Sequence, residues 1–189
     1  MIATALSGGF AEAPTQSARA FRAILEAMAR PGTIHAVTGA QPPAPLSTAA
    51  GVMLLTLCDS TTPLHLAGAA DSPTLRDWIA FHIGAPLVPA EDAAFALGRW
   101  DDLCPASRFR IGQPDYPDRS ATLIVEMDRL TNHGPTLSGP GIETAAWLNL
   151  PETAAFRQNR ALFPLGFDTI FTSGDRIAAL PRSTRVEAI

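Results

Sequence analysis

The clearest periodic segment of the chain is an amphipathic helix predicted from Gln16 to Arg30. Four large apolar residues recur at the spacing of one helical face: Phe21, Ile24, Leu25 and Met28. Thr15 is placed to cap the amino end, and Pro31-Gly32 ends the helix. Three charged residues fall on the other face, which we expect to be solvated: Arg19, Arg22 and Glu26. The pattern predicts a surface helix whose apolar face packs on a core.

Helix-like and strand-like segments alternate along the rest of the chain. Further helices are predicted at 48–58 after a Ser47 cap, at 73–82, and at 152–162, where Phe156 and Phe163 would share one side. Short strands are predicted at 33–37, 63–67, 120–127, 145–148, 167–172 and 176–180. Gly174-Asp175 fits a two-residue hairpin turn between the last two strands, and residues 100–118 look like an exposed loop. The alternation predicts one domain over residues 1–189, a three-layer α/β/α sandwich with a mixed sheet.

Composition adds two constraints on function. Only 17% of the 189 residues are charged and 47% are apolar, which predicts a sizeable protein interface. The net charge of −4 argues against nucleic-acid binding. All 14 basic residues are arginine. Because there is no lysine, the chain cannot form a Schiff base with pyridoxal phosphate or build a Walker A phosphate loop.

The cysteines and histidines form no recognisable metal motif. Cys58 lies in an apolar run and is expected to be buried, and Cys104 is distant from it in the sequence. The four histidines lack the spacing of metal ligands, so we expect neither a structural zinc nor an iron–sulfur cluster. The first 18 residues contain no Arg or Lys, and the longest apolar run, 49–58, is too short for a bilayer. These features predict a cytoplasmic protein with no membrane segment.

Two short segments carry the candidate binding residues. Gly139 and Gly141 can turn backbone N–H groups toward an anion, although a tight structural turn is the preferred interpretation. Arg182, Thr184 and Arg185 combine guanidinium and hydroxyl groups, a mixture that suits phosphate. The alternative for Arg182, which we prefer, is an internal ion pair with Asp168. No catalytic residue can be identified from these patterns.

Several short segments follow one another in order over nearly the whole chain. They read FRAILEAMARPG at 21–32, LLTLCD at 54–59 with TP at 62–63, FH at 81–82 with APLV at 85–88, SATLI at 120–124, LSGPGI at 137–142, FPLGFD at 163–168 and LPRSTRVE at 180–187. Together these segments resemble the PhnH family, subunits of the bacterial carbon–phosphorus lyase system. No single segment is specific, but their combination is. Residues 100–117 match least.

The resemblance implies a fold similar to that of pyridoxal-phosphate-dependent transferases but without the cofactor site, so no cofactor is expected. It also implies a homodimer when isolated, and the partner subunits PhnG, PhnI, PhnJ and possibly PhnL. The implied role is an accessory subunit in making ribose 1-methylphosphonate 5-triphosphate from MgATP and methylphosphonate. The alternatives are a structural scaffold and a free-standing enzyme or binding protein for a phosphorylated small molecule. The family supplies no catalytic residue to carry over.

Overall fold

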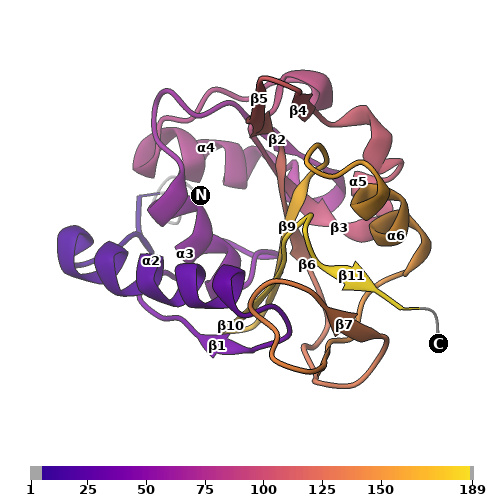
Figure 1. The fold of residues 1–189 in the computed structure, drawn as a ribbon. Helices are drawn as coiled ribbons and strands as arrows, with labels where there is room; N and C mark the ends of the chain where they lie inside the picture. The colour runs from indigo at the N-terminus through magenta and orange to yellow at the C-terminus, as the bar shows by residue number, and fades with distance from the viewer. Residues whose placement is uncertain (1–5, 188–189) are drawn as a thin grey trace.

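A computed structural model describes residues 6–187 of the chain (Figure 1). The helices are α2 (Ala13–Ala29), α3 (Thr48–Leu57), α4 (Pro73–His82), α5 (Trp100–Leu103) and α6 (Ala154–Ala161). The strands are β1 (His35–Ala36), β2 (Leu64–Leu66), β3 (Phe95–Arg99), β4 (Ile111–Gln113), β5 (Tyr116–Ser120), β6 (Thr122–Glu126), β7 (Thr136–Ser138), β8 (Ala146–Trp147), β9 (Asp168–Ser173), β10 (Arg176–Leu180) and β11 (Arg185–Val186). Most of the predicted elements are therefore present; four of the strands are shorter than predicted, and β9 and β10 have the predicted length.

The centre of the molecule is a six-stranded sheet in the order β1-β10-β9-β6-β3-β2. Strands β2, β3, β6 and β9 are parallel to one another, whereas β10 runs antiparallel to both β9 and β1. Ser173 pairs with Arg176 across the β9–β10 hairpin, which confirms the predicted turn at Gly174-Asp175. The predicted α/β class with a mixed sheet is thus confirmed.

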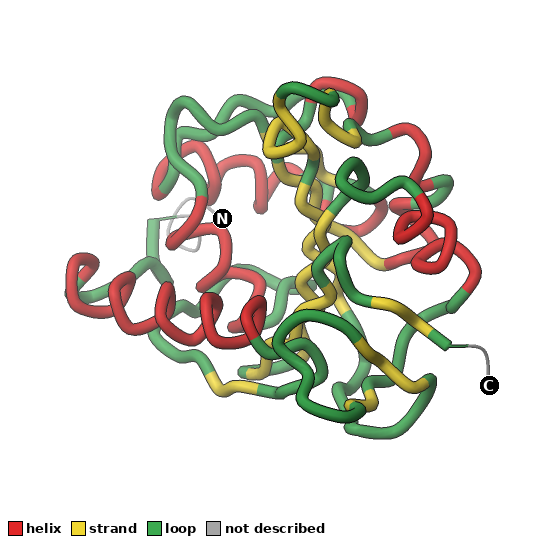
Figure 2. The backbone as a smooth tube through the Cα atoms, viewed as in Figure 1, coloured by secondary structure: helices red, strands yellow, loops and turns green. Residues whose placement is uncertain are grey.

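Successive residues of the central strands belong to two separate hydrophobic cores, because side chains alternate between the two faces of a sheet. Ile124 of β6 joins the core under α2, α3 and α4, while its neighbour Leu123 joins the core on the opposite face. That second face is covered by α5, α6 and a small sheet in the order β11-β7-β8. Figure 2 shows how much of this covering is loop and short strand rather than helix.

Two helices begin where their sequences predict. Ser47 caps α3, because its hydroxyl accepts a hydrogen bond from the backbone N–H of Ala50 at 3.1 Å. Ser72 does the same for Leu75 in α4, and Pro73 occupies the first helical turn. Helix α3 is apolar nearly all round and is buried from Ala49 to Leu54, as a helix packed on several sides must be.

Helix α2 departs from its prediction in two respects. It begins at Ala13 with Glu12 as the N-cap residue, so Thr15 lies inside the helix. The predicted apolar face is also rotated. The residues buried in the core are Ala20, Ile24 and Ala27, whereas Phe21 and Leu25 remain 52% and 56% exposed. Two alanines on the inner face let the helix approach α3 and β10 closely, and the larger side chains then point outward.

Residues 100–118 are not the exposed loop that their composition predicts. They contain α5, β4 and most of β5, and three of their apolar side chains are buried: Trp100, Leu103 and Phe109. The Trp100 ring stacks 4.8 Å from Phe156 of α6, a long-range contact that no local pattern reveals. Phe163 was expected on the same side as Phe156 but is 50% exposed, because α6 ends at Ala161 before it. No helix within residues 6–187 is long and apolar enough to cross a membrane.

Candidate functional site

The structure brings together the two segments that carry the candidate binding residues. Arg185 of β11 pairs with Ser138 of β7, so the chain end runs beside the glycine loop that follows β7. A Cβ atom added to Gly139 would lie 3.2 Å from the carbonyl oxygen of Ser183. Arg182 and Gly141 both line one hollow of about 490 Å³. The predicted residues therefore share one region of the surface.

The glycine loop has a structural reason for its composition. Gly141 has φ +80°, and a Cβ atom there would stand 1.8 Å from the carbonyl oxygen of Ala29 at the end of α2. Gly139 also has a positive φ, +130°. Both positions therefore require glycine to let the loop close against α2 and the chain end. This agrees with the preferred interpretation of the segment as a tight turn.

Arg182 forms the internal ion pair that the sequence favours. Its Nη2 lies 2.5 Å from Oδ2 of Asp168, and its Nε donates to Oδ1 at 3.2 Å. Nη1 donates to the carbonyl of Pro117 at 2.7 Å, and Nη2 also donates to the hydroxyl of Ser120. The two charged side chains are only 13% and 20% exposed. Most of the guanidinium N–H groups are therefore already used within the protein.

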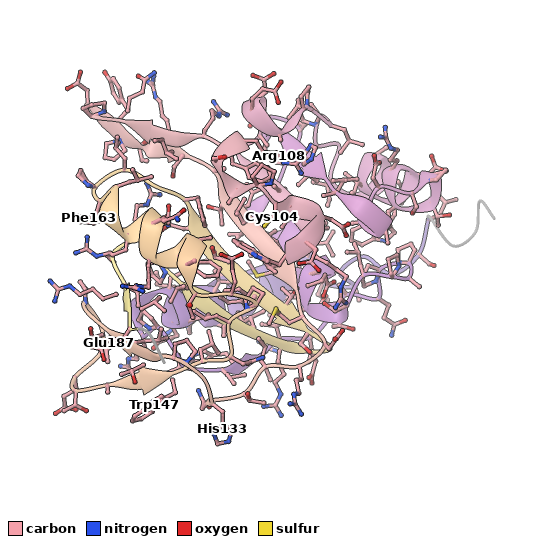
Figure 3. The ribbon with its side chains drawn as sticks, turned by 90° about the vertical axis from the view of Figure 1, so that its right-hand side faces the viewer. Cys104, Arg108, His133, Trp147, Phe163 and Glu187 are labelled. Atoms are coloured by element: carbon pink, nitrogen blue, oxygen red, sulfur yellow. The ribbon has the colours of Figure 1, made fainter. Side chains whose placement is uncertain are left out.

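The other two candidates are placed differently. Thr184 is 2% exposed, and its hydroxyl has no hydrogen-bond partner within the described residues. Arg185 is exposed at the free edge of the small sheet. The hollow beside them is lined largely by apolar and proline side chains: Met28, Pro117, Pro140, Phe163, Pro164 and Pro181. The hollow is open to solvent at Phe163, which is 50% exposed and is labelled near the edge of the molecule in Figure 3.

A second candidate region lies where the parallel strands β3 and β6 end. In open α/β sheets, ligands bind beyond the carboxyl ends of parallel strands. Two adjoining cavities of about 320 and 270 Å³ occupy this edge and share Arg99, Glu126, Met127 and Asp128. Arg99 is the last residue of β3 and Glu126 the last of β6, so the sheet itself places both. None of the sequence-predicted site residues lies in this region, although Glu126 at the end of a buried strand is a signal in the sequence that points to it.

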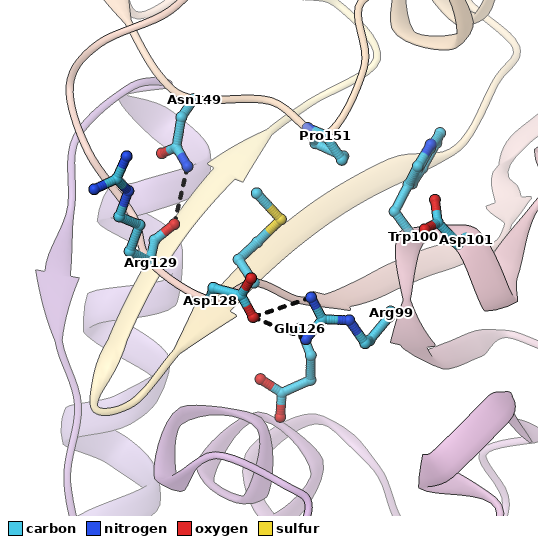
Figure 4. A pocket seen from close by; sticks show the side chains of 9 residues that line it. Arg99, Trp100, Asp101, Glu126, Asp128, Arg129, Asn149 and Pro151 are labelled. Atoms are coloured by element: carbon cyan, nitrogen blue, oxygen red, sulfur yellow. Dashed lines mark hydrogen bonds and ion pairs between the residues drawn. The ribbon is translucent and has the colours of Figure 1, made fainter.

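Glu126 is held by two hydrogen bonds from opposite sides. The backbone N–H of Ser47 donates to Oε1 at 2.7 Å, and the Thr172 hydroxyl donates to Oε2 at 3.1 Å. Burial nevertheless raises the pKa of the Glu126 carboxyl, because desolvation outweighs these bonds and the attraction of Arg99. In Figure 4 the carboxylate points away from the neighbouring ion pair. Glu126 thus supplies a hydrogen-bond acceptor that is largely shielded from solvent and lines both cavities.

The ion pair above Glu126 is solvent-exposed. Both Nη atoms of Arg99 donate to Oδ1 of Asp128 at 3.0 Å, as drawn in Figure 4. Their side chains are 57% and 83% exposed, so the pair contributes little to stability. The guanidinium holds the pKa of the Asp128 carboxyl below its usual range. The Arg99 guanidinium is therefore more accessible to a ligand than that of Arg182.

The side chains that could bind a metal ion or act through a thiol are dispersed or buried in the described residues. No three His, Cys, Asp or Glu side chains of residues 6–187 come together as a metal site. Cys58 is buried, as predicted, and burial raises the pKa of its thiol to about 12. The thiol of Cys104 also has a raised pKa, mainly through desolvation. A raised pKa lowers the thiolate fraction of both cysteines at neutral pH, and the thiolate is the reactive form.

Comparison with known proteins assigns the chain to a family. Residues 8–187 match the model of the family described as "Bacterial phosphonate metabolism protein (PhnH)". The chain therefore belongs to the PhnH family. It is 38% identical over 190 residues to the alpha-D-ribose 1-methylphosphonate 5-triphosphate synthase subunit PhnH of Rhizobium meliloti (strain 1021), covering 96% of this chain and 95% of that protein. It is 32% identical over 186 residues to a putative C-P lyase subunit protein, HtxG, of Stutzerimonas stutzeri, covering 93% and 87%.

Proposed function

We propose that the protein is an accessory subunit of a carbon–phosphorus lyase system for organic phosphonate breakdown. Its role is to assist partner subunits in making ribose 1-methylphosphonate 5-triphosphate from MgATP and methylphosphonate. The observation that carries the proposal is the match along nearly the full length of two relatives that are both named as subunits.

The proposed partners are PhnG, PhnI and PhnJ, with PhnL as a further candidate, and the proposed location is the cytoplasm. The test is to purify this chain and the partner subunits separately and together, and to measure adenine release from MgATP and methylphosphonate. We expect no release by this chain alone and a rate that depends on its addition to the partners. Unchanged adenine release without this chain would refute an accessory role in that reaction.

We also propose that the fold is a variant of the three-layer α/β/α sandwich, similar to that of pyridoxal-phosphate-dependent transferases but without the cofactor site. Helices on one face of the sheet, and helices with a small sheet on the other, support this description. The missing lysine supports the loss of the cofactor.

The isolated chain is further proposed to be a homodimer. Eight large apolar side chains of the described residues remain exposed on a charge-poor surface, which supports a protein interface. Sedimentation equilibrium at micromolar concentration measures the mass directly. Twice the chain mass of 19.9 kDa is expected, and a monomer mass at all concentrations would refute the dimer.

One observation favours a second function, the binding of a phosphorylated small molecule. Arg99 lies between two cavities at the carboxyl edge of the sheet, and its partner Asp128 is exposed enough to be displaced by a phosphate. Calorimetric titration of the isolated chain with ribose 5-phosphate tests this function. Saturable binding that is lost in Arg99→Met would support it, and no heat of binding in the wild type would exclude it for this probe.

A further inference from the structure

The outer face of helix α2 carries an uninterrupted apolar stripe. With 3.6 residues per turn, five positions fall along one line of the helix. These residues, which we call the α2 stripe, are Pro14, Ala18, Phe21, Leu25 and Ala29. All five are exposed, and Phe21 and Leu25 each leave more than half of their side-chain surface in solvent. The helix is attached to the core through other residues, so the stripe has no role in holding it there.

Charged residues flank the stripe on one side only. On its other side lies Ile24, which is buried in the core. The residues that border it on the open side are Arg19, Arg22, Glu26 and Arg30. Glu26 and Arg30 pair with each other at 3.6 Å, whereas Arg19 and Arg22 have no partner within residues 6–187. The border therefore leaves two unpaired positive charges beside a hydrophobic surface.

The stripe leads into the open hollow described above. Met28 and Ala29, in the last turn of α2, line that hollow together with Phe163 and Pro164. Phe163 is 50% exposed. The apolar surface thus extends from the start of α2 across its last turn to the residues that follow α6. Exposed apolar side chains that follow one line of a helix and continue into a partly apolar hollow indicate a protein interface.

The shape and charge of this surface indicate which kind of protein segment would bind it. It is a convex row about one side chain wide, which a helix can follow with residues spaced three and four apart. The stripe itself is helical, so it offers no strand edge to which an extended segment could add. The unpaired arginines at the border favour acidic residues opposite them.

We propose that the α2 stripe is the docking surface for an amphipathic helix of a partner subunit, with an apolar ridge bordered by Asp or Glu. This inference rests on the proposed function as a subunit. Phe21 and Leu25 supply the central apolar contact, and Arg19 and Arg22 pair with the acidic border. None of these four side chains belongs to either core or forms a hydrogen bond or ion pair within the described residues, so we expect the fold to tolerate their substitution.

The test compares variants in assembly with purified PhnG, PhnI and PhnJ. The double variant Phe21→Gln/Leu25→Gln keeps good helix formers on α2 and is expected to weaken assembly at least tenfold, measured by titration calorimetry, with an unchanged melting temperature. Arg19→Glu/Arg22→Glu is expected to weaken assembly as well, and to reverse the effect of added salt on it. Phe81→Gln is the matched control, since Phe81 is equally exposed at 59% but lies on α4.

Each outcome has one meaning. If the wild type assembles and the Phe21→Gln/Leu25→Gln variant assembles with the same affinity, the docking proposal is wrong while the proposed function stands. If the wild type does not assemble with any partner subunit, the proposed function itself fails. If the double variant keeps its assembly with partners but loses self-association in sedimentation, the occupant is a second copy of this chain and the proposal is overturned.

Discussion

Arg182 and Asp168 form a bidentate ion pair that fastens the segment after β10 to the first residue of β9. The same aspartate also accepts a hydrogen bond from the backbone N–H of Arg182 at 2.8 Å. Through its remaining N–H groups Arg182 reaches Pro117 and Ser120, which belong to β5. One side chain thus joins the chain end, the central sheet and the β4–β5 hairpin.

Arg182→Met is expected to lower the free energy of unfolding by about 3 kcal/mol, because it leaves the partly buried Asp168 carboxylate without its partner. Asp168→Asn should share most of the loss, and the double variant should cost less than the sum of the two. Urea denaturation of the four proteins measures these differences. Arg176→Met is the control, since Arg176 pairs with Asp175 at the surface. Equal stability of Arg182→Met and wild type would disprove a structural role for the pair.

Gly141→Ala is expected to destabilise the fold more than a similar change elsewhere. The added Cβ would meet the carbonyl oxygen of Ala29 at 1.8 Å, in addition to the strain of the positive φ. We expect a loss on the order of 3 kcal/mol. Gly174→Ala separates the two effects, because Gly174 also has a positive φ, +57°, but has nothing within 4 Å of an added Cβ. It should cost about 1 kcal/mol. Similar melting temperatures for the two variants would contradict the packing argument.

Glu126 is expected to make the stability of the protein depend on pH. Its pKa is raised in the folded state, so the folded protein binds this proton more tightly than the unfolded chain does. Stability contributed by the protonated carboxyl is therefore present below the ordinary glutamate pKa of 4.5 and is lost as pH rises through the folded-state value.

Removing the titrating group tests this directly. Glu126→Gln should gain stability relative to the wild type as the pH is raised above about 4.5, measured by urea denaturation across a pH series. Glu143→Gln, at an exposed glutamate, is the control for removing a carboxylate charge at the surface. A Glu126→Gln difference that does not change with pH would show that the carboxylate is solvated in the folded protein.

The isolated chain is expected to retain no pyridoxal phosphate. The internal aldimine of that cofactor requires a lysine, and all 14 basic residues are arginine. Incubation with excess cofactor, dialysis and a visible absorption spectrum give the measurement. A retained aldimine band, fixed to this chain by borohydride reduction, would overturn the expectation.

The sequence by itself determined the class of the fold and most of its local elements. Serine caps, the stop at Pro31-Gly32 and the Gly174-Asp175 turn act over a few residues, so local patterns suffice to find them. The same holds for the buried strand β6, whose apolar run needs no partner to be recognised. The pairing of Arg182 with Asp168 was also foreseeable, because both flank the two strands of one hairpin.

Only the tertiary structure decided which side of α2 is buried. The helical period places Phe21 and Leu25 beside Ile24. No local pattern indicates that the helix instead buries the face that carries Ala20 and Ala27. The tertiary structure also decided that Trp100 packs on Phe156 and that Glu126 accepts a hydrogen bond from Ser47 at the start of α3. Both contacts join residues more than 50 positions apart in the sequence. Such contacts depend on the order in which the strands assemble and on how closely small side chains let helices approach. These are properties of the whole packed chain and of no single segment within it.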